Sequence, residues 1–427
     1  MSPPLFLKPL VFGLLLTLNF EVLAEMPVLT LQTATEIALQ DNPDLAQMQA
    51  RAKAMSAIPS QEGTLPDPKI TFNAMSLPVN SLNLKQEEMT QLGIGISQEF
   101  PFPGKLALRE QAASFEAQAE SHNVTEVRQR LLSEVKMMWW TIFYLDRTLA
   151  LVENNHTLLQ QFVQIARKKY EVGIGLQQDV LLAQLELSKL LDQQLMLNGS
   201  RRNAVASLNA LLNQPANTTL KLPETVALSV PTVKAENLLY QEAENSRAIL
   251  ESNRQTIDAA KSRLELAKKD YLPDFMVDVS YGARANTPTG MSRSDLLSVN
   301  VGVNVPIFAE TKQAKAVEQK TSELLRDQYA LQDEWNKVRS QITQAYSDYQ
   351  RAKEQFTLYD TSILPQARQT VASMLAGYQV NKVDFLNLVR SQMTLFEYEI
   401  QYWKALTETN QALAQLTVAV GEGDIYE

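Results

Sequence analysis

The chain of 427 residues has no cysteine and only two histidines, so several kinds of chemistry are excluded. Without thiols there is no disulfide scaffold and no thiolate nucleophile, and dedicated zinc or copper sites lack their usual ligands. Glycine is scarce as well, at 14 residues, or about 3% against an average usage of roughly 7%. Because turns favour glycine, this shortage predicts few turns and long elements between them.

Signatures of enzymes and of nucleic-acid binding are also missing. The sequence contains no P-loop, no Gly-x-Ser-x-Gly elbow and no His-Glu-x-x-His pair. The net charge is -9, and we find no basic patch of the kind that binds nucleic acid. We therefore expect no enzymatic activity, no cofactor, no metal site and no nucleic-acid partner.

The amino-terminal residues 1–24 have the pattern of a secretory signal peptide. Lys8 precedes an apolar run over 10–18, and Val22-Leu23-Ala24 suits signal peptidase. We expect cleavage after Ala24 rather than an uncleaved anchor, because the run is shorter than the ~20 residues of a spanning helix. Without cysteine, no lipid anchor on a mature cysteine is expected. No later stretch reaches ~18 uninterrupted apolar residues, so membrane contact requires another device.

Two very long helices are predicted over 106–172 and 311–380. In the first helix, one row of residues is spaced by alternating steps of four and three. All of its members are apolar or aromatic except one histidine: Met138, Ile142, Leu145, Leu149, Val152, His156, Leu159, Val163, Ala166 and Tyr170. This 3.5-residue period is typical of coiled coils, and His156 suits a register-fixing polar position better than a metal ligand. Pro365 should kink the second long helix. Shorter helices are expected over 30–57, 178–212, 234–269 and 384–418.

Four short segments alternate apolar with polar residues: 70–74, 92–97, 277–282 and 297–305. Period two with one apolar face predicts four β-strands of about ten residues each, the length that a strand of a membrane barrel requires. The alternative is a half-buried sheet of a water-soluble protein. No further run of strands is present to cover the apolar face, which favours the membrane. The fold class is therefore mainly α with a small β part.

The sequence repeats itself at spacings of 205 to 208 residues. Leu65-Pro66-Asp67 matches Leu272-Pro273-Asp274, and the helix ends at 170–173 and 378–381 match as well. We predict two structural repeats, 25–220 and 221–427, each with a helix, two strands, a long helix and a shorter helix.

Four strands cannot close a barrel, and an open sheet edge in lipid leaves backbone groups unsatisfied. Several chains must therefore pool their strands. Two chains give a barrel of eight strands, whose interior would be filled by side chains. Three chains give a barrel of twelve strands, which is wide enough for a pore. Three chains are the better arrangement for a conduit.

With these features, the chain resembles the TolC-like outer-membrane efflux protein family over essentially its whole mature length. The resemblance is carried by the turns at 170–173 and 378–381, the helix restarts at Asp179 and Asp384, and the strand end at 305–308. The stretch 98–105, Gln-Glu-Phe-Pro-Phe-Pro-Gly-Lys, is similar to the heavy-metal cation efflux branch. Asn381 departs from the glycine that is common in the family at the second turn, although Asn also tolerates a left-handed cap.

The resemblance implies a homotrimer, with a twelve-stranded barrel in the outer membrane and a long coiled-coil helical barrel in the periplasm. Such a protein docks with a periplasmic adaptor (membrane fusion) protein and an inner-membrane efflux pump, and it passes substrate, including heavy-metal cations, to the outside. A non-conducting periplasmic coiled-coil scaffold or adaptor remains the alternative.

The turns between the helices lie farthest from the strands, so we expect them to contact the adaptor. The docking residues predicted there are Tyr170, Val172, Gly173, Gly175, Asp179, Tyr378, Val380 and Asn381. The family comparison also implies a periplasmic gate at the start of the last helix, formed by Asp384, Asn387 and Lys382. In the simplest interpretation, Asp384 caps the last helix. In the alternative, the three Asp384 side chains of a trimer surround its axis and form an acidic ring.

Overall fold

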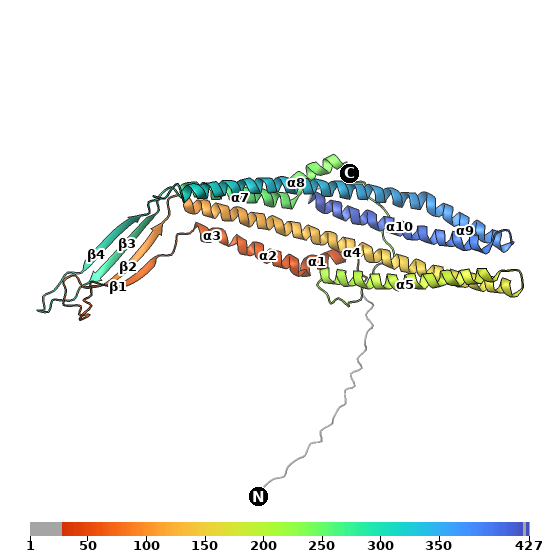
Figure 1. The fold of residues 1–427 in the computed structure, drawn as a ribbon, viewed down its shortest axis with the longest axis horizontal. Coiled ribbons are helices and arrows are strands. Elements are labelled where there is room, and N and C mark those ends of the chain that lie inside the picture. Colours follow the sequence, from red (N-terminus) through yellow and green to blue (C-terminus); the bar gives the residue numbers. More distant parts are fainter. Residues whose placement is uncertain (1–27, 422–423, 427) are drawn as a thin grey trace, which may run out of the picture.

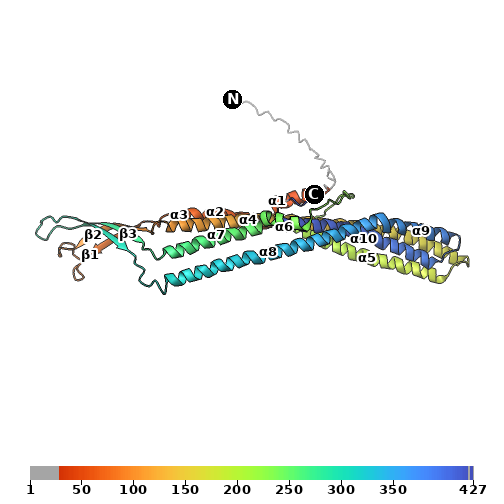
Figure 2. The ribbon, with the colours of Figure 1, turned by 90° about the horizontal axis from the view of Figure 1, so that it is seen from above.

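A small sheet occupies one end of this elongated molecule, and two helical hairpins reach the other end (Figure 1). The computed structural model describes residues 28–421 and 424–426, so the predicted signal peptide at 1–24 lies outside the described residues. Figure 2, a view at right angles, shows the helices again running lengthwise from the sheet. The predicted fold class, mainly helical with a small β part, is confirmed.

One order of elements occurs twice along the chain: helices, two strands, a long helical segment and a shorter helix. The first half contains α1 (Leu31–Asp41), α2 (Pro43–Ser56), α3 (Ile58–Gly63), β1 (Lys69–Met75), β2 (Gln91–Phe100), α4 (Lys105–Glu171) and α5 (Gln177–Leu211). The second half contains α6 (Glu236–Ser246), α7 (Ala248–Lys269), β3 (Phe275–Ala283), β4 (Leu296–Val303), α8 (Gln313–Leu358), the π-helical turn η1 (Tyr359–Ile363), α9 (Leu364–Gln379) and α10 (Phe385–Val420).

Helix α4 is the longest element and contacts most of the others. Its 67 residues rise on the order of 100 Å. It packs against α2, α3 and α7 over the part nearer the sheet and against α5 and α10 over the far part. Among the described residues, none of the helices is both long enough and apolar enough to cross a bilayer.

Two of the predicted helices are each broken into two by one extended residue. Asn42 separates α1 from α2, caps α2 by accepting from the Leu45 N–H, and donates to the Leu211 carbonyl at the end of α5. Arg247 separates α6 from α7 and binds the Val418 carbonyl near the end of α10. A short helix therefore ends where another begins, in both halves of the chain.

The junction at Arg247 is charged and buried. Its side chain is only 5% exposed, and its guanidinium lies 2.8 Å from a carboxylate oxygen of Glu126 on α4. Burial raises the pKa of Glu126, although the charge of Arg247 opposes that rise. Asn42, at the corresponding junction of the first half, is neutral. Removal of either charged partner would leave the other buried without a counter-charge, which is costly.

The four strands form one antiparallel sheet in the order β1-β2-β3-β4. Its register aligns side chains of one kind across all four strands. One row consists of Ile70, Ile96, Val279 and Val299, and the row beside it on the opposite face consists of Thr71, Gly95, Ser280 and Ser298. The predicted alternation therefore produces one apolar and one polar face.

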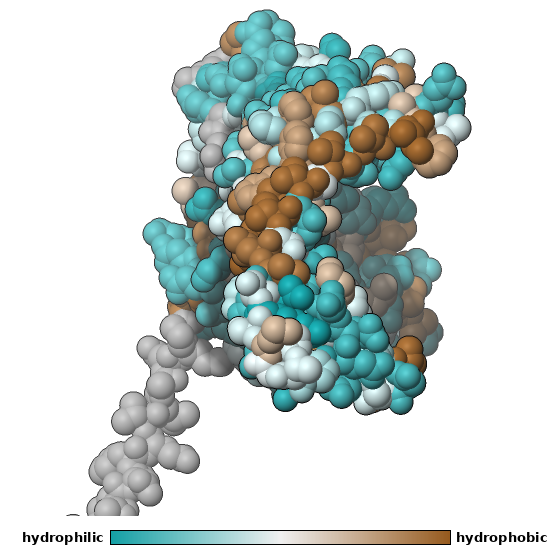
Figure 3. All heavy atoms as spheres, turned by 90° about the vertical axis from the view of Figure 1, so that its left-hand side faces the viewer, coloured by the Kyte–Doolittle hydropathy of each residue, from teal (hydrophilic) through white to brown (hydrophobic). Residues whose placement is uncertain are grey.

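The apolar face is uncovered within the described chain. Phe72 is 79% exposed and Leu297 is 71% exposed, although both belong to side-chain types that are normally buried. Figure 3, which views the molecule from the sheet end, shows apolar side chains as a continuous band between polar areas. Strands β1 and β4 are the free edges of this sheet.

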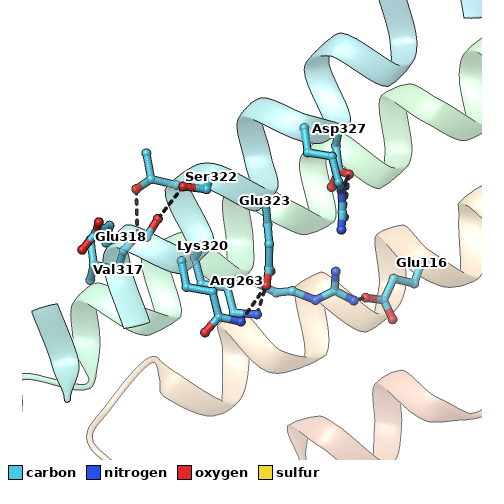
Figure 4. A network of polar contacts seen from close by, with 11 residues as sticks. Glu116, Arg263, Val317, Glu318, Lys320, Ser322, Glu323 and Asp327 are labelled. Atoms are coloured by element: carbon cyan, nitrogen blue, oxygen red, sulfur yellow. Dashed lines mark hydrogen bonds and ion pairs between the residues drawn. The ribbon is translucent and has the colours of Figure 1, made fainter. Parts of the chain in front are cut away.

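Ion pairs lie on the helices close to the sheet, and one of them links two helices. Arg263 of α7 points across to Glu116 of α4 and forms an ion pair with it (Figure 4). On α8, Lys320 and Glu323 form a further ion pair at 2.8 Å. The larger apolar clusters lie farther along, around Trp139 in the middle of the molecule and around Phe385 near the hairpin turns.

A buried polar pair interrupts the apolar seam between α4 and α10. Asn155 is 4% and Gln392 is 6% exposed, and the Gln392 amide donates to the Asn155 side-chain oxygen at 2.9 Å. The register-fixing position predicted at His156 is therefore wrong by one residue, because His156 lies at the partly exposed edge of the seam. A polar residue at such a position specifies which residues of two helices face each other.

The long helix of the second half is interrupted by the π-helical turn η1, directly before Pro365. Before it, buried residues of α4 recur in α8 at a spacing of 207, as in Val135 with Ile342 and Ile142 with Tyr349. After it, the helix ends Tyr170 and Tyr378 are 208 apart. A π-turn contains one extra residue, which accounts for this difference. The sequence predicts a kink at Pro365, and what lies directly before that residue is this π-helical turn.

The Asn155–Gln392 pair yields a stability test. Gln392→Leu leaves the Asn155 oxygen buried without a donor, and we expect a loss of about 1–3 kcal/mol. Converting both residues to leucine should recover most of that loss, since no polar group is then stranded. Thermal loss of the helical circular-dichroism signal in detergent measures the effect, with Gln401→Leu on the exposed face of α10 as the control. Equal midpoints for the single and double variants would contradict this assignment.

Candidate functional site

The two hairpin turns lie at the end of the molecule that is farthest from the sheet (Figure 1). The first turn, 172–176, joins α4 to α5, and the second, 380–384, joins α9 to α10. Both carry residues that the sequence marked as candidates for docking or gating. Their geometry decides what these residues can do.

The first turn closes through a left-handed glycine. Gly173 has a φ of +77°, and its N–H donates to the Tyr170 carbonyl at 3.0 Å. A Cβ at Gly173 would meet nothing within 4 Å, so substitution there costs backbone strain alone. At Gly175, by contrast, a Cβ would lie 2.8 Å from the Lys169 Cβ, so this glycine is required by the close approach of the chain.

The second turn uses an asparagine for the same purpose. Asn381 has a φ of +57°, as expected from its tolerance of the left-handed region. The Lys382 N–H donates to the Gly377 carbonyl at 2.9 Å and completes the helix end. A Cβ at Gly377 would lie 2.6 Å from a methyl of Val383, so this glycine lets the turn fold closely onto α9.

Asp384 caps the last helix. Its Oδ1 accepts from the Asn387 N–H at 2.8 Å, and its Oδ2 accepts from the Asn387 side-chain amide at 3.1 Å. Both residues are exposed. Lys382 is exposed too, and it forms no ion pair with the described residues of its own chain. The three gate candidates therefore lie together on the surface, with Asp384 and Asn387 in direct contact.

Lys169, in the last turn of α4, connects the two turns, a role that no local sequence pattern indicates. Its ammonium lies 3.9 Å from the centre of the Tyr378 ring and 2.8 Å from the Asn381 side-chain oxygen. It also donates to the Tyr378 carbonyl at 3.3 Å. A cation over an aromatic face is attracted by the negative charge of that face. One lysine thus holds the second turn against the end of the first long helix.

Tyr378 is the least exposed of the predicted docking residues, at 7%. Its ring packs against Phe385, with ring centres 5.5 Å apart. Burial, together with the negative charge of Asp179, raises the pKa of Tyr378, so the phenol is neutral at physiological pH. Tyr378 therefore supports the turn from inside and presents little surface, whereas its repeat counterpart Tyr170 is 48% exposed.

Apolar side chains point outward around both turns. Val172 is 69% and Val380 is 62% exposed, and Ile174 and Leu176 extend the same surface. Large exposed apolar groups that lie together mark sites of association.

Among the described residues, no group of three or more His, Asp or Glu side chains is placed to hold a metal ion.

Loss of Lys169 should loosen the second turn. Lys169→Met keeps the length and apolar character of the side chain but removes the charge and three contacts. We expect faster amide hydrogen exchange over 378–386, because those contacts no longer restrain the turn. Lys168→Met is the matched control, since Lys168 is exposed. Equal exchange rates in both variants would show that the Lys169 contacts do not restrain the turn.

The sequence of this chain is similar to those of known proteins. A family model described as outer membrane efflux protein matches residues 34–214 and again 239–422. The cobalt-zinc-cadmium resistance protein CzcC of Cupriavidus metallidurans is 20% identical over 401 residues, which cover 92% of this chain and 90% of that protein. The outer membrane protein TolC of Vibrio cholerae is 20% identical over 391 residues, which cover 90% of this chain and 89% of that protein.

Solved structures share the fold. The outer-membrane channel OprN superposes with a TM-score of 0.77 at 17% identity, covering 92% of this chain and 90% of that chain. The outer membrane protein VceC of Vibrio cholerae gives a TM-score of 0.76 at 17% identity, covering 92% of this chain and 96% of that chain. At such identities the likeness establishes the fold.

Proposed function

Because this chain belongs to the outer membrane efflux protein family, we propose that it forms the outer-membrane exit duct of a tripartite efflux system. The family places it in the outer membrane. The observation that carries the proposal is the division of the molecule: an uncovered amphipathic sheet at one end and long helical hairpins at the other. The sheet suits lipid, and the hairpins suit contact with partners across the periplasm.

The proposed assembly is a homotrimer whose twelve strands close one barrel. The support is that each sheet has two free edges and one exposed apolar face. In lipid, unpaired backbone groups at those edges are costly, and closure through neighbouring copies removes the edges. A non-conducting periplasmic scaffold would have no use for a lipid-compatible face, which makes the duct the better proposal.

The hairpin turns are the proposed docking surface for a periplasmic adaptor. Exposed Tyr170, Val172 and Val380 supply apolar contact there, and the left-handed Gly173 and Asn381 set the shape of the turns. An inner-membrane pump would then deliver substrate through the adaptor. Heavy-metal cations are the proposed cargo, supported by the stretch 98–105 and by the similarity to a protein named for cobalt, zinc and cadmium resistance.

The proposed gate consists of Asp384 copies brought together around the trimer axis. Confined carboxylates repel one another and attract cations. Asn387 belongs to the same site through its two hydrogen bonds to Asp384, and Lys382 is available to pair with an acid of a neighbouring copy. The gate would therefore prefer cations and remain narrow in the isolated trimer.

The assembly is tested by fractionation and mass. We expect the protein in the outer-membrane fraction, as a trimer in detergent that persists without heating, because the pooled strands bury their edges. Native mass spectrometry of the purified protein gives the number of chains. A monodisperse monomer recovered in soluble form from the periplasm would refute the proposed duct.

The gate is tested by separating the charge of Asp384 from its capping role. Asp384→Asn removes the charge but keeps a side-chain acceptor for the Asn387 N–H, whereas Asp384→Ala removes both and costs the helix about 1 kcal/mol. In planar bilayers, both variants should show higher single-channel conductance and a weaker cation preference. The difference from the unmodified trimer should shrink with salt, because charges are screened over ~10 Å at 0.1 M. Unchanged selectivity in Asp384→Asn would leave Asp384 as a cap alone.

A further inference from the structure

A buried lysine fastens the sheet to the helices in the middle of the chain. Lys105, the first residue of α4, is 3% exposed and lies 2.9 Å from an Asp274 carboxylate oxygen and 3.3 Å from one of Asp270. It also donates to the Leu272 carbonyl at 3.0 Å. The other contact of Asp274 Oδ1 is the Phe102 N–H at 2.7 Å. These contacts link the end of β2 to the start of β3, which are neighbours in the sheet.

Both partners of this ion pair come from repeated stretches of sequence. Asp274 ends Leu272-Pro273-Asp274, and its counterpart 207 residues earlier is Asp67, which precedes β1. The counterpart of Lys105 at the same spacing is Lys312, which directly precedes α8. Buried residues of α4 and α8 follow this spacing as well, as in Leu131 with Val338.

The second pair is separated within one chain. Asp67 lies next to β1 and Lys312 follows β4, and these strands are the two opposite edges of the sheet. Both side chains are exposed, and neither forms an ion pair with the described residues of its own chain. Their charges are complementary, and each stands where its repeat counterpart is engaged.

We propose that Lys312 forms an ion pair with Asp67 of the partner subunit, which joins β4 of one copy to β1 of the next. The inference rests on the proposed trimer and assigns its contact between subunits. In the first repeat, the residue that corresponds to Asp270 is Gly63. The proposed contact between subunits therefore has one carboxylate, whereas the contact of Lys105 within the chain has two.

The repeat also predicts the register of the joined strands. Gln98 of β2 faces Val277 of β3. The ends of β2 and β4 are related by a spacing of 205 residues, so the counterpart of Gln98 is Val303. The starts of β1 and β3 are related by a spacing of 207 residues, so the counterpart of Val277 is Ile70. Val303 then faces Ile70 of the partner subunit, and Val301 faces Phe72 of the partner subunit. The apolar face therefore continues from one subunit to the next without a polar interruption.

Asp67 has an alternative basic neighbour inside its own chain. Arg109 of α4 lines the same surface hollow as Asp67. If Asp67 formed an ion pair with Arg109 of its own chain in the membrane-embedded protein, Lys312 would have no part in assembly. Substitution of the two cations separates these arrangements, because each predicts a different sensitive residue.

Cysteine crosslinking tests the contact directly, since the natural chain contains no cysteine. The unmodified trimer is first established by native mass spectrometry. Asp67→Cys with Lys312→Cys, treated with a short bifunctional thiol reagent, should give covalently linked trimers on a denaturing gel. Asp67→Cys with Lys315→Cys, one turn along α8, is the matched control and should give far less. Equal yields from both pairs in an intact trimer would overturn the inference and leave the duct standing.

Charge exchange supplies the second readout. Asp67→Lys and Lys312→Asp should each lower the temperature at which the trimer dissociates, and the two together should restore it, while Arg109→Gln should leave it unchanged. Additive losses in the double variant, or a loss confined to Arg109→Gln, would overturn the proposed pair. If the unmodified chain forms no trimer, the proposed function fails first and this inference fails with it.

Discussion

Close packing of apolar side chains along α4 is the interaction on which the rest of the structure depends. A single helix of 67 residues is stable in water only when a continuous face is buried, because propensity alone contributes little. Helix α7 covers that face nearer the sheet, and helices α5 and α10 cover it over the far part. The sheet and the hairpin turns are thereby held far apart at fixed positions, and each can meet a different environment.

The predictable parts of the fold are those with a strict period. The seam through Ile142, Val152 and Leu159 and the alternation through Val299 and Val301 are repeated signals, and both recur in the structure. The breaks at Asn42 and Arg247 were not predicted, because one extended residue changes the periodicity too little to be noticed. Pro43 was a usable signal for the first break, whereas nothing local marks the second.

The candidate site was predicted in part. The left-handed positions of Gly173 and Asn381 follow from the conformational freedom of those residue types, and the cap at Asp384 follows from its side-chain chemistry. Lys169 was missed because its partners are more than 200 residues away in the chain, so no local pattern reveals them. Burial of Tyr378 has the same origin: it is decided by Phe385 and its neighbours in the folded hairpin.

The π-helical turn keeps two parts of a long helix in phase. One residue inserted into a regular α-helix rotates everything beyond it by about 100°, which would turn a buried stripe toward water. At η1 the extra residue is absorbed in a wider loop of backbone, so Tyr349 before it and Tyr378 after it are both buried. The long helical segments of the two halves therefore differ by one residue between their buried middle parts and their ends, and the angular mismatch is confined to a single turn.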